Sequence, residues 1–172
     1  MNRLAIVIGA AAVVAGLGMH GQAGAVTINR HHFSHGTASC QAALPVFDGN
    51  IRKRPLAIAN EGNSNAFVTC DTDNVNDAAS GARFHLIVLA FVNRSSQPVT
   101  VSCTLVDGVS YGLPLYFPKM TGPIAVNAVG TLAWFPSDNG GSKFGVPATS
   151  CDLPPGVEIA VVGFFYDEEI GA

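Results

Sequence analysis

Two short stretches of the chain concentrate side chains that bind metal ions. His31, His32 and His35 fall within five residues, and neutral imidazoles at such spacing bind copper or zinc. A second stretch offers the oxygen ligands that calcium prefers, from Asp71, Asp73, Asn74, Asn76 and Asp77. It is not an EF-hand loop, because Asn76 stands where that loop requires glycine. Both stretches also have a plainer interpretation, a mobile polar leader for the histidines and an ordinary polar loop for the acidic residues.

The residues of the common hydrolases are not arranged for catalysis in this sequence. It contains no Gly-x-Ser-x-Gly elbow and no His-Glu-x-x-His pair. His85 stands in an otherwise apolar strand, which favours a structural histidine over a general base. Glu168 and Glu169 are neighbours and would point to opposite faces of a strand, which is wrong for an acid and a base acting on one bond. The sequence therefore favours a non-catalytic protein, with a metal-assisted hydrolase as the alternative.

Exposed aromatic residues are the other candidates for binding. Tyr111, Tyr116 and Phe117 lie in a segment broken by prolines, where planar rings can stack on sugars or on a partner protein. Trp134 alternates with Leu132 in a strand-like run and is therefore predicted to be a core residue. The irregular loop from Asp107 to Gly122 is the predicted contact surface.

The first residues predict export. Asn2 and Arg3 give a positive start, residues 4–17 are apolar or glycine, and residues 23–25 form a small-x-small site, as in a secretory signal peptide over residues 1–25. Cleavage after Ala23 is an alternative. Removing Arg3 leaves eight basic and twelve acidic residues, a net charge of minus four, which favours neither nucleic acid nor anionic lipid as a partner. We expect a secreted or periplasmic chain with no membrane anchor after cleavage.

An even number of cysteines in an exported chain favours disulfides over free thiols or metal ligands. The four are Cys40, Cys70, Cys103 and Cys151, and no pair has the spacing of a zinc knuckle. Three pairings are possible, of which we favour Cys40 with Cys70 and Cys103 with Cys151.

The remaining pattern predicts the fold. Short strand-like runs alternate with turn signals every 8 to 12 residues and no segment has helical periodicity, which is typical of an antiparallel β-sandwich of the immunoglobulin-like or a similar Greek-key kind. Residues 84–92 and 157–165 are apolar on both faces, so they are predicted to be central strands covered on both sides. Residues 26–39 are predicted to form a flexible polar leader, and residues 40–172 a single domain.

Three phrases, CQAALPVFDGNIRKRPLAIANEGNSNAFVTC, VSCTLVDG and TSCDLPPG, resemble those of small exported bacterial proteins with four cysteines and no assigned function. The resemblance covers most of the chain from Cys40 onward. It implies a compact disulfide-bonded domain and brings no catalytic residue. The leading hypothesis is a secreted or periplasmic binding module with a protein or glycan partner at the cell exterior. A subunit of a surface assembly that exchanges strands is a further alternative.

Overall fold

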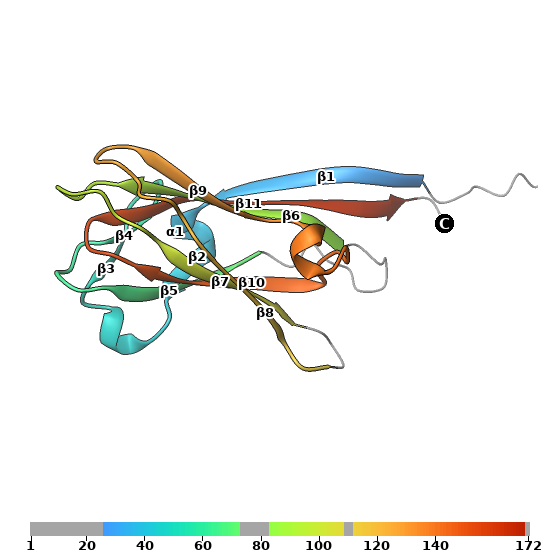
Figure 1. Cartoon of the computed structure of the whole chain (residues 1–172), viewed down its shortest axis with the longest axis horizontal. Helices are drawn as coiled ribbons and strands as arrows, with labels where there is room; N and C mark the ends of the chain where they lie inside the picture. Colours follow the sequence, from blue (N-terminus) through green and yellow to red (C-terminus); the bar gives the residue numbers. More distant parts are fainter. Residues whose placement is uncertain (1–25, 73–82, 109–111, 171–172) are drawn as a thin grey trace, which may run out of the picture.

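The protein is an antiparallel β-sandwich with two disulfides, as predicted. The computed structural model describes residues 26–72, 83–108 and 112–170 and shows two sheets packed face to face (Figure 1). Sheet A contains β1 (Val26–His35), β3 (Ile51–Lys53), β4 (Ile58–Asn60), β6 (Arg83–Asn93), β9 (Val129–Trp134) and β11 (Val157–Ile170). Sheet B contains β2 (Cys40–Ala42), β5 (Ala66–Asp71), β7 (Ser102–Gly108), β8 (Leu115–Met120) and β10 (Val146–Leu153). Three short helical turns connect them, α1 (Gly36–Ser39), η1 (Pro45–Phe47) and η2 (Pro136–Asn139). None of the helices in these ranges is long and apolar enough to cross a membrane.

The two sheets share one plan of strand order. Sheet A runs β3-β4-β11-β6-β9, and β1 pairs with the edge of β11 where the pairing with β4 has ended. Sheet B runs β2-β5-β10-β7-β8. The β4–β5 unit therefore crosses from sheet A to sheet B on one side of β10 and β11, and the β6–β7 unit crosses on the other side. We call these two units the arches.

A buried asparagine closes each arch in the same way. Asn60 donates from Nδ2 to the Ser64 carbonyl at 2.8 Å and accepts from the Gly62 amide at 3.0 Å. Asn93 repeats this pattern with the Gln97 carbonyl at 2.8 Å and the Ser95 amide at 2.9 Å. Each asparagine thus satisfies the backbone of the turn that follows it, which a buried corner requires.

Both predicted disulfides are present, and each joins two neighbouring strands of sheet B. Cys40 bonds to Cys70 across β2 and β5, and Cys103 bonds to Cys151 across β7 and β10. In each case the two cysteines are directly opposite in the strand register. All four are buried.

The core lies between the sheets and contains large aromatic side chains. Trp134 is fully buried, as predicted, and its Nε1 donates to the Phe117 carbonyl at 2.8 Å. Phe84, Phe91, Phe144 and Phe164 are likewise fully buried. The arrangement satisfies the one polar atom of the indole while burying its ring.

The prediction of a flexible leader over residues 26–39 is wrong. Residues 26–35 form β1, which pairs with residues 161–170 of β11 without any shift of register. β4 pairs with β11 only at Glu158 and Ile159, so most of that edge of β11 is left for β1 to pair with. The strand forms because a long partner is available, and its own sequence carries only a weak alternation.

The prediction that prolines exclude a ladder between residues 107 and 122 is also wrong. β8 pairs with β7 over six residues, with Pro118 opposite Thr104. β8 is an edge strand of sheet B. A proline is tolerated in an edge strand when its nitrogen, which carries no hydrogen, faces away from the neighbouring strand.

Candidate functional site

The structure does not bring the three candidate metal-binding histidines together. They all lie in β1, where His31 and His35 belong to one face and His32 to the other. His31 and His35 are four residues apart, about 13 Å along an extended strand. His32 instead stacks on Phe164 on the core side, with ring centroids 5.1 Å apart. Across the described ranges, no group of three His, Cys, Asp or Glu side chains is placed to hold a metal ion.

Most of the proposed calcium ligands lie outside the described residues. Asp73, Asn74, Asn76 and Asp77 belong to this part, so the calcium hypothesis stays a prediction. Asp71 ends β5, is exposed and accepts a hydrogen bond from the Thr72 amide at 2.7 Å.

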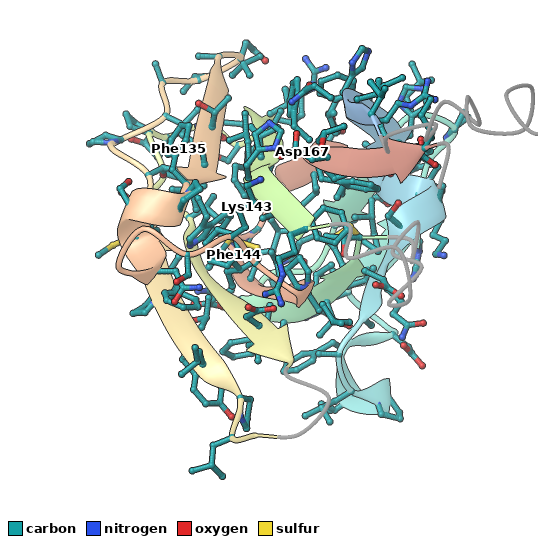
Figure 2. All side chains as sticks on the ribbon, turned by 90° about the vertical axis from the view of Figure 1, so that its right-hand side faces the viewer. Phe135, Lys143, Phe144 and Asp167 are labelled. Carbon is teal, nitrogen blue, oxygen red and sulfur yellow. A yellow bond between two sulfur atoms is a disulfide. The ribbon has the colours of Figure 1, made fainter. Side chains whose placement is uncertain are left out.

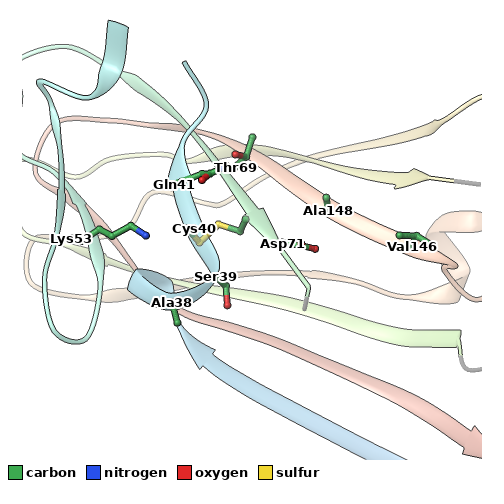
Figure 3. Close-up of a pocket in the computed structure, with 10 residues that line it drawn as sticks. Ala38, Ser39, Cys40, Gln41, Lys53, Thr69, Asp71, Val146 and Ala148 are labelled. Carbon is green, nitrogen blue, oxygen red and sulfur yellow. A yellow bond between two sulfur atoms is a disulfide. The ribbon is translucent and has the colours of Figure 1, made fainter. Parts of the chain in front are cut away.

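Asp71 also lines an open pocket of about 570 Å³ beside the Cys40–Cys70 disulfide (Figure 3). The lining comes from α1, β2, β3, β5 and β10 and includes one cation, Lys53. Polar contributions come from Ser39, Gln41 and Thr69. One carboxylate and one ammonium group offset each other in charge, so the pocket has no strong preference for an ion of either sign.

The predicted aromatic binding residues divide into three outcomes. Tyr116 lies in β8 and is 64% exposed, as a binding residue requires. Phe117 points the other way and packs against the core, edge-on to Phe144. Its assignment to a binding surface is therefore wrong, because neighbouring residues of a strand face opposite sides. Tyr111 lies outside the described residues.

A β-bulge places His85 on the outer side of sheet A. The register between β6 and β11 shifts where Phe165 faces Leu86 and Tyr166 faces Phe84, which leaves His85 as the extra residue. Phe84 on one side of the bulge and Ile87 on the other are buried, whereas His85 and Leu86 remain partly exposed. Bulges of this kind redirect a side chain, and here the redirected side chain is an imidazole.

Three polar side chains, Asn29, Lys143 and Asp167, gather around this imidazole, so that four side chains form one network. Asn29 of β1 approaches His85 Nε2 with its Nδ2 at 3.1 Å and donates to Asp167 Oδ1 at 3.4 Å. Lys143 forms an ion pair with Asp167 (Figure 2). His85 Nδ1 is buried without a hydrogen bond and lies 3.7 Å from Asp167 Oδ1. We call these four side chains the Asp167 network.

The network holds Asp167 in its charged form. The hydrogen bond from Lys143 lowers the pKa of Asp167; partial burial opposes this shift, and the charges of Lys143 and His85 and the Asn29 amide add to it. The arrangement supplies hydrogen-bond donors and acceptors at the edge of an exposed surface.

An aromatic cluster lies next to the network on the same face. The Phe33 ring lies against Gly163, where an added Cβ would come within 2.5 Å of the ring. Phe165 meets Phe33 edge-on at a centroid distance of 5.6 Å, and His31 lies within 5.8 Å of both rings. Phe33 is nevertheless 53% exposed. The glycine thus allows a phenylalanine to lie across the sheet while one side of its ring stays in solvent.

The rest of this face is mostly aliphatic. On β6 the core residues alternate with partly exposed Leu86, Val88, Ala90 and Val92. Most of their cross-strand neighbours on β11 and β9 are apolar, but Glu158 lies opposite Val92 and Thr131 lies opposite Ala90. We define the outer apolar face as Phe33, Leu86, Val88, Ala90, Val92, Ala133, Val161 and Phe165. The prediction that the central strands are covered on both sides is therefore wrong, since this side of them stays partly exposed.

Sequence reasoning did not find this site. Asn29, His85, Lys143 and Asp167 are separated by up to 138 residues. They come together through the pairing of β11 with β1 and β6 and through the bridge between Phe84 and Phe144. The available signal was the alternation of Gly163, Phe165 and Asp167, which places all three on one face of a strand.

Comparisons with known proteins do not identify the chain. No protein-family model matches it, and no curated protein matches it. Among solved structures, TmCBM61 in complex with β-1,4-galactotriose is similar at a TM-score of 0.30, with 7% sequence identity over 83% of this chain and 88% of that chain. A likeness this distant does not bear on the ligand of this chain.

Proposed function

We propose that the chain is an exported, non-catalytic β-sandwich module that binds a protein partner through the outer apolar face of sheet A. The observation that carries this proposal is the half-exposed Phe33 ring, held over Gly163 in the middle of a row of aliphatic side chains. Contiguous apolar patches on a soluble protein are costly to leave in water, and they mark interaction sites.

The layout of this face supports a protein partner over a sugar. Protein interfaces combine an apolar centre, an aromatic anchor and a polar rim. Here the aliphatic side chains of β6 and β11 supply the centre, Phe33 supplies the anchor, and the Asp167 network lies at the border. A sugar site would need more hydrogen-bonding groups across the surface than an aliphatic face offers.

Two further observations support export. Both disulfides join buried cysteines, and such bonds persist in oxidising compartments. The signal-peptide pattern of residues 1–25 agrees with that compartment.

Site-specific photo-crosslinking tests the proposal. A photoreactive phenylalanine analogue at Val92, on the outer apolar face, is compared with the same analogue at Thr104, on the outer side of sheet B. We expect a crosslinked protein from position 92 that is absent from position 104 and is lost when Phe33→Ser is added. Equal labelling from the two positions, or labelling unaffected by Phe33→Ser, would contradict the proposal. A glycan that binds in a screen and requires Phe33 would replace the protein partner.

A further inference from the structure

β1 has one paired edge and one unpaired edge. Its ten residues follow β11 without interruption, and no other described strand pairs with it. Figure 1 shows β1 lying along β11 for the length of the strand. An unpaired edge exposes a row of backbone amides and carbonyls, and the partner that satisfies such a row is another extended strand.

β1 lacks the features that usually protect an edge. Its sequence, VTINRHHFSH, contains no proline, no lysine and no acidic residue. Its single formal charge, Arg30, is already paired with Glu168 of β11 at 2.9 Å. The edges of sheet B differ, because β8 carries Pro118 and Lys119 and β2 has only three residues. In sheet A, β3 also has three residues, and β9 has six. β9, with the sequence VGTLAW, also has no proline and no charge, so β1 is the longest edge without such protection.

We propose that β1 pairs antiparallel with β1 of a second copy of this chain. A two-fold axis perpendicular to the sheet would join the two A sheets into one and keep both outer apolar faces on the same side. A second copy fits better than a charged peptide, because Arg30 is neutralised within its own sheet and β1 has no other formal charge to attract one. When two copies of β1 pair antiparallel, side chains that lie opposite each other point to the same face, so the outward and inward sets of the two copies match.

This inference rests on the backbone edge and not on the proposed function. The dimer could form with the outer apolar face unoccupied, and the two interactions are separable by mutation. Phe33→Ser removes an apolar side chain from that face and leaves the backbone of β1 in place, so it is expected to reduce partner crosslinking while the dimer persists.

Cysteine scanning tests the pairing. Single cysteines are placed in β1 at Thr27, Asn29, His31 and Phe33, with Thr131→Cys in β9 as the matched control at the other edge of sheet A. In a two-fold antiparallel pair only the residue near the axis faces itself. A step of two residues away from it separates the two copies by about 13 Å along the strands. We expect disulfide-linked dimers to peak at one position of the scan.

Sedimentation across a concentration series provides the second measurement. We expect the unmodified mature chain to dimerise, His31→Lys to weaken the dimer about tenfold, a change of about 1.4 kcal/mol, and Thr131→Lys to leave it unchanged. Burial of Trp134, followed by its fluorescence, shows that each variant is folded. A chain that stays monomeric, or a scan in which no β1 position crosslinks more than Thr131→Cys does, would overturn the proposal.

Discussion

Replacing Asn93 with alanine is expected to destabilise the fold by about 3 kcal/mol. Asn93 is fully buried and makes four hydrogen bonds, to the Gln97 and Ile124 carbonyls and from the Ser95 amide and hydroxyl, all between 2.7 and 2.9 Å. At a net value of about 1 kcal/mol each, their loss would cost roughly 4 kcal/mol. Without Asn93, the single hydroxyl proton of Ser95 can donate to the Gln97 carbonyl instead, and the Ile124 carbonyl keeps the Val99 amide as a donor, so we place the cost somewhat lower.

Urea denaturation of the mature protein measures this change. With a slope of about 2 kcal/mol per molar urea, the midpoint should fall by about 1.5 M. Asn60→Ala should give a similar shift, because Asn60 closes the other arch. Asn65→Ala is the matched control, since its hydrogen bond to Asp152 is exposed and should be worth less than about 1 kcal/mol. If Asn93→Ala shifts the midpoint no more than Asn65→Ala does, the role assigned to the buried asparagines is refuted.

Three other properties of the fold can be measured directly. Replacing both Cys103 and Cys151 with serine opens a loop spanning 48 residues and should cost about 4 kcal/mol on the chain-entropy model, and a loss below about 1 kcal/mol in chemical denaturation would contradict it. Because the pKa of Asp167 is lowered in the folded state, its stabilising effect is complete above about pH 5 and is lost as the pH falls through the folded pKa. Lys143→Met should therefore flatten the fall in melting temperature below about pH 4, and an unchanged profile would show that the ion pair does not stabilise the fold. Trp134 should emit as a buried indole and resist acrylamide quenching until the protein unfolds, whereas quenching in the native state would place it at the surface.

The parts of the fold that follow from local pattern could be predicted from the sequence. Residues 84–92 and 157–165 are interior strands of sheet A, as predicted, although their outer faces stay partly exposed. The disulfide pairing was also predicted, although both bonds link adjacent strands of one sheet, a placement that the sequence does not specify.

The parts that depend on distant partners could not be predicted. β1 forms because β11 leaves an edge open, and β8 tolerates Pro118 because it is the last strand of its sheet. The candidate site depends on these pairings and on the bulge at His85, so it was not visible in any single stretch of sequence. One signal was present and not used. Cys70 stands ten residues after Asn60, and Cys103 stands ten residues after Asn93, which repeats the arch along the chain.

The strand order has a consequence for when the fold can be completed during synthesis. Among the described strands, β10 and β11 come last in the sequence, yet each occupies the interior of its sheet, between the two arches. Until residues 146–170 have emerged, the arches have no common partner, and Cys103 lacks its native partner Cys151. The two sheets can therefore complete their pairing only after residues 146–170 have been synthesised.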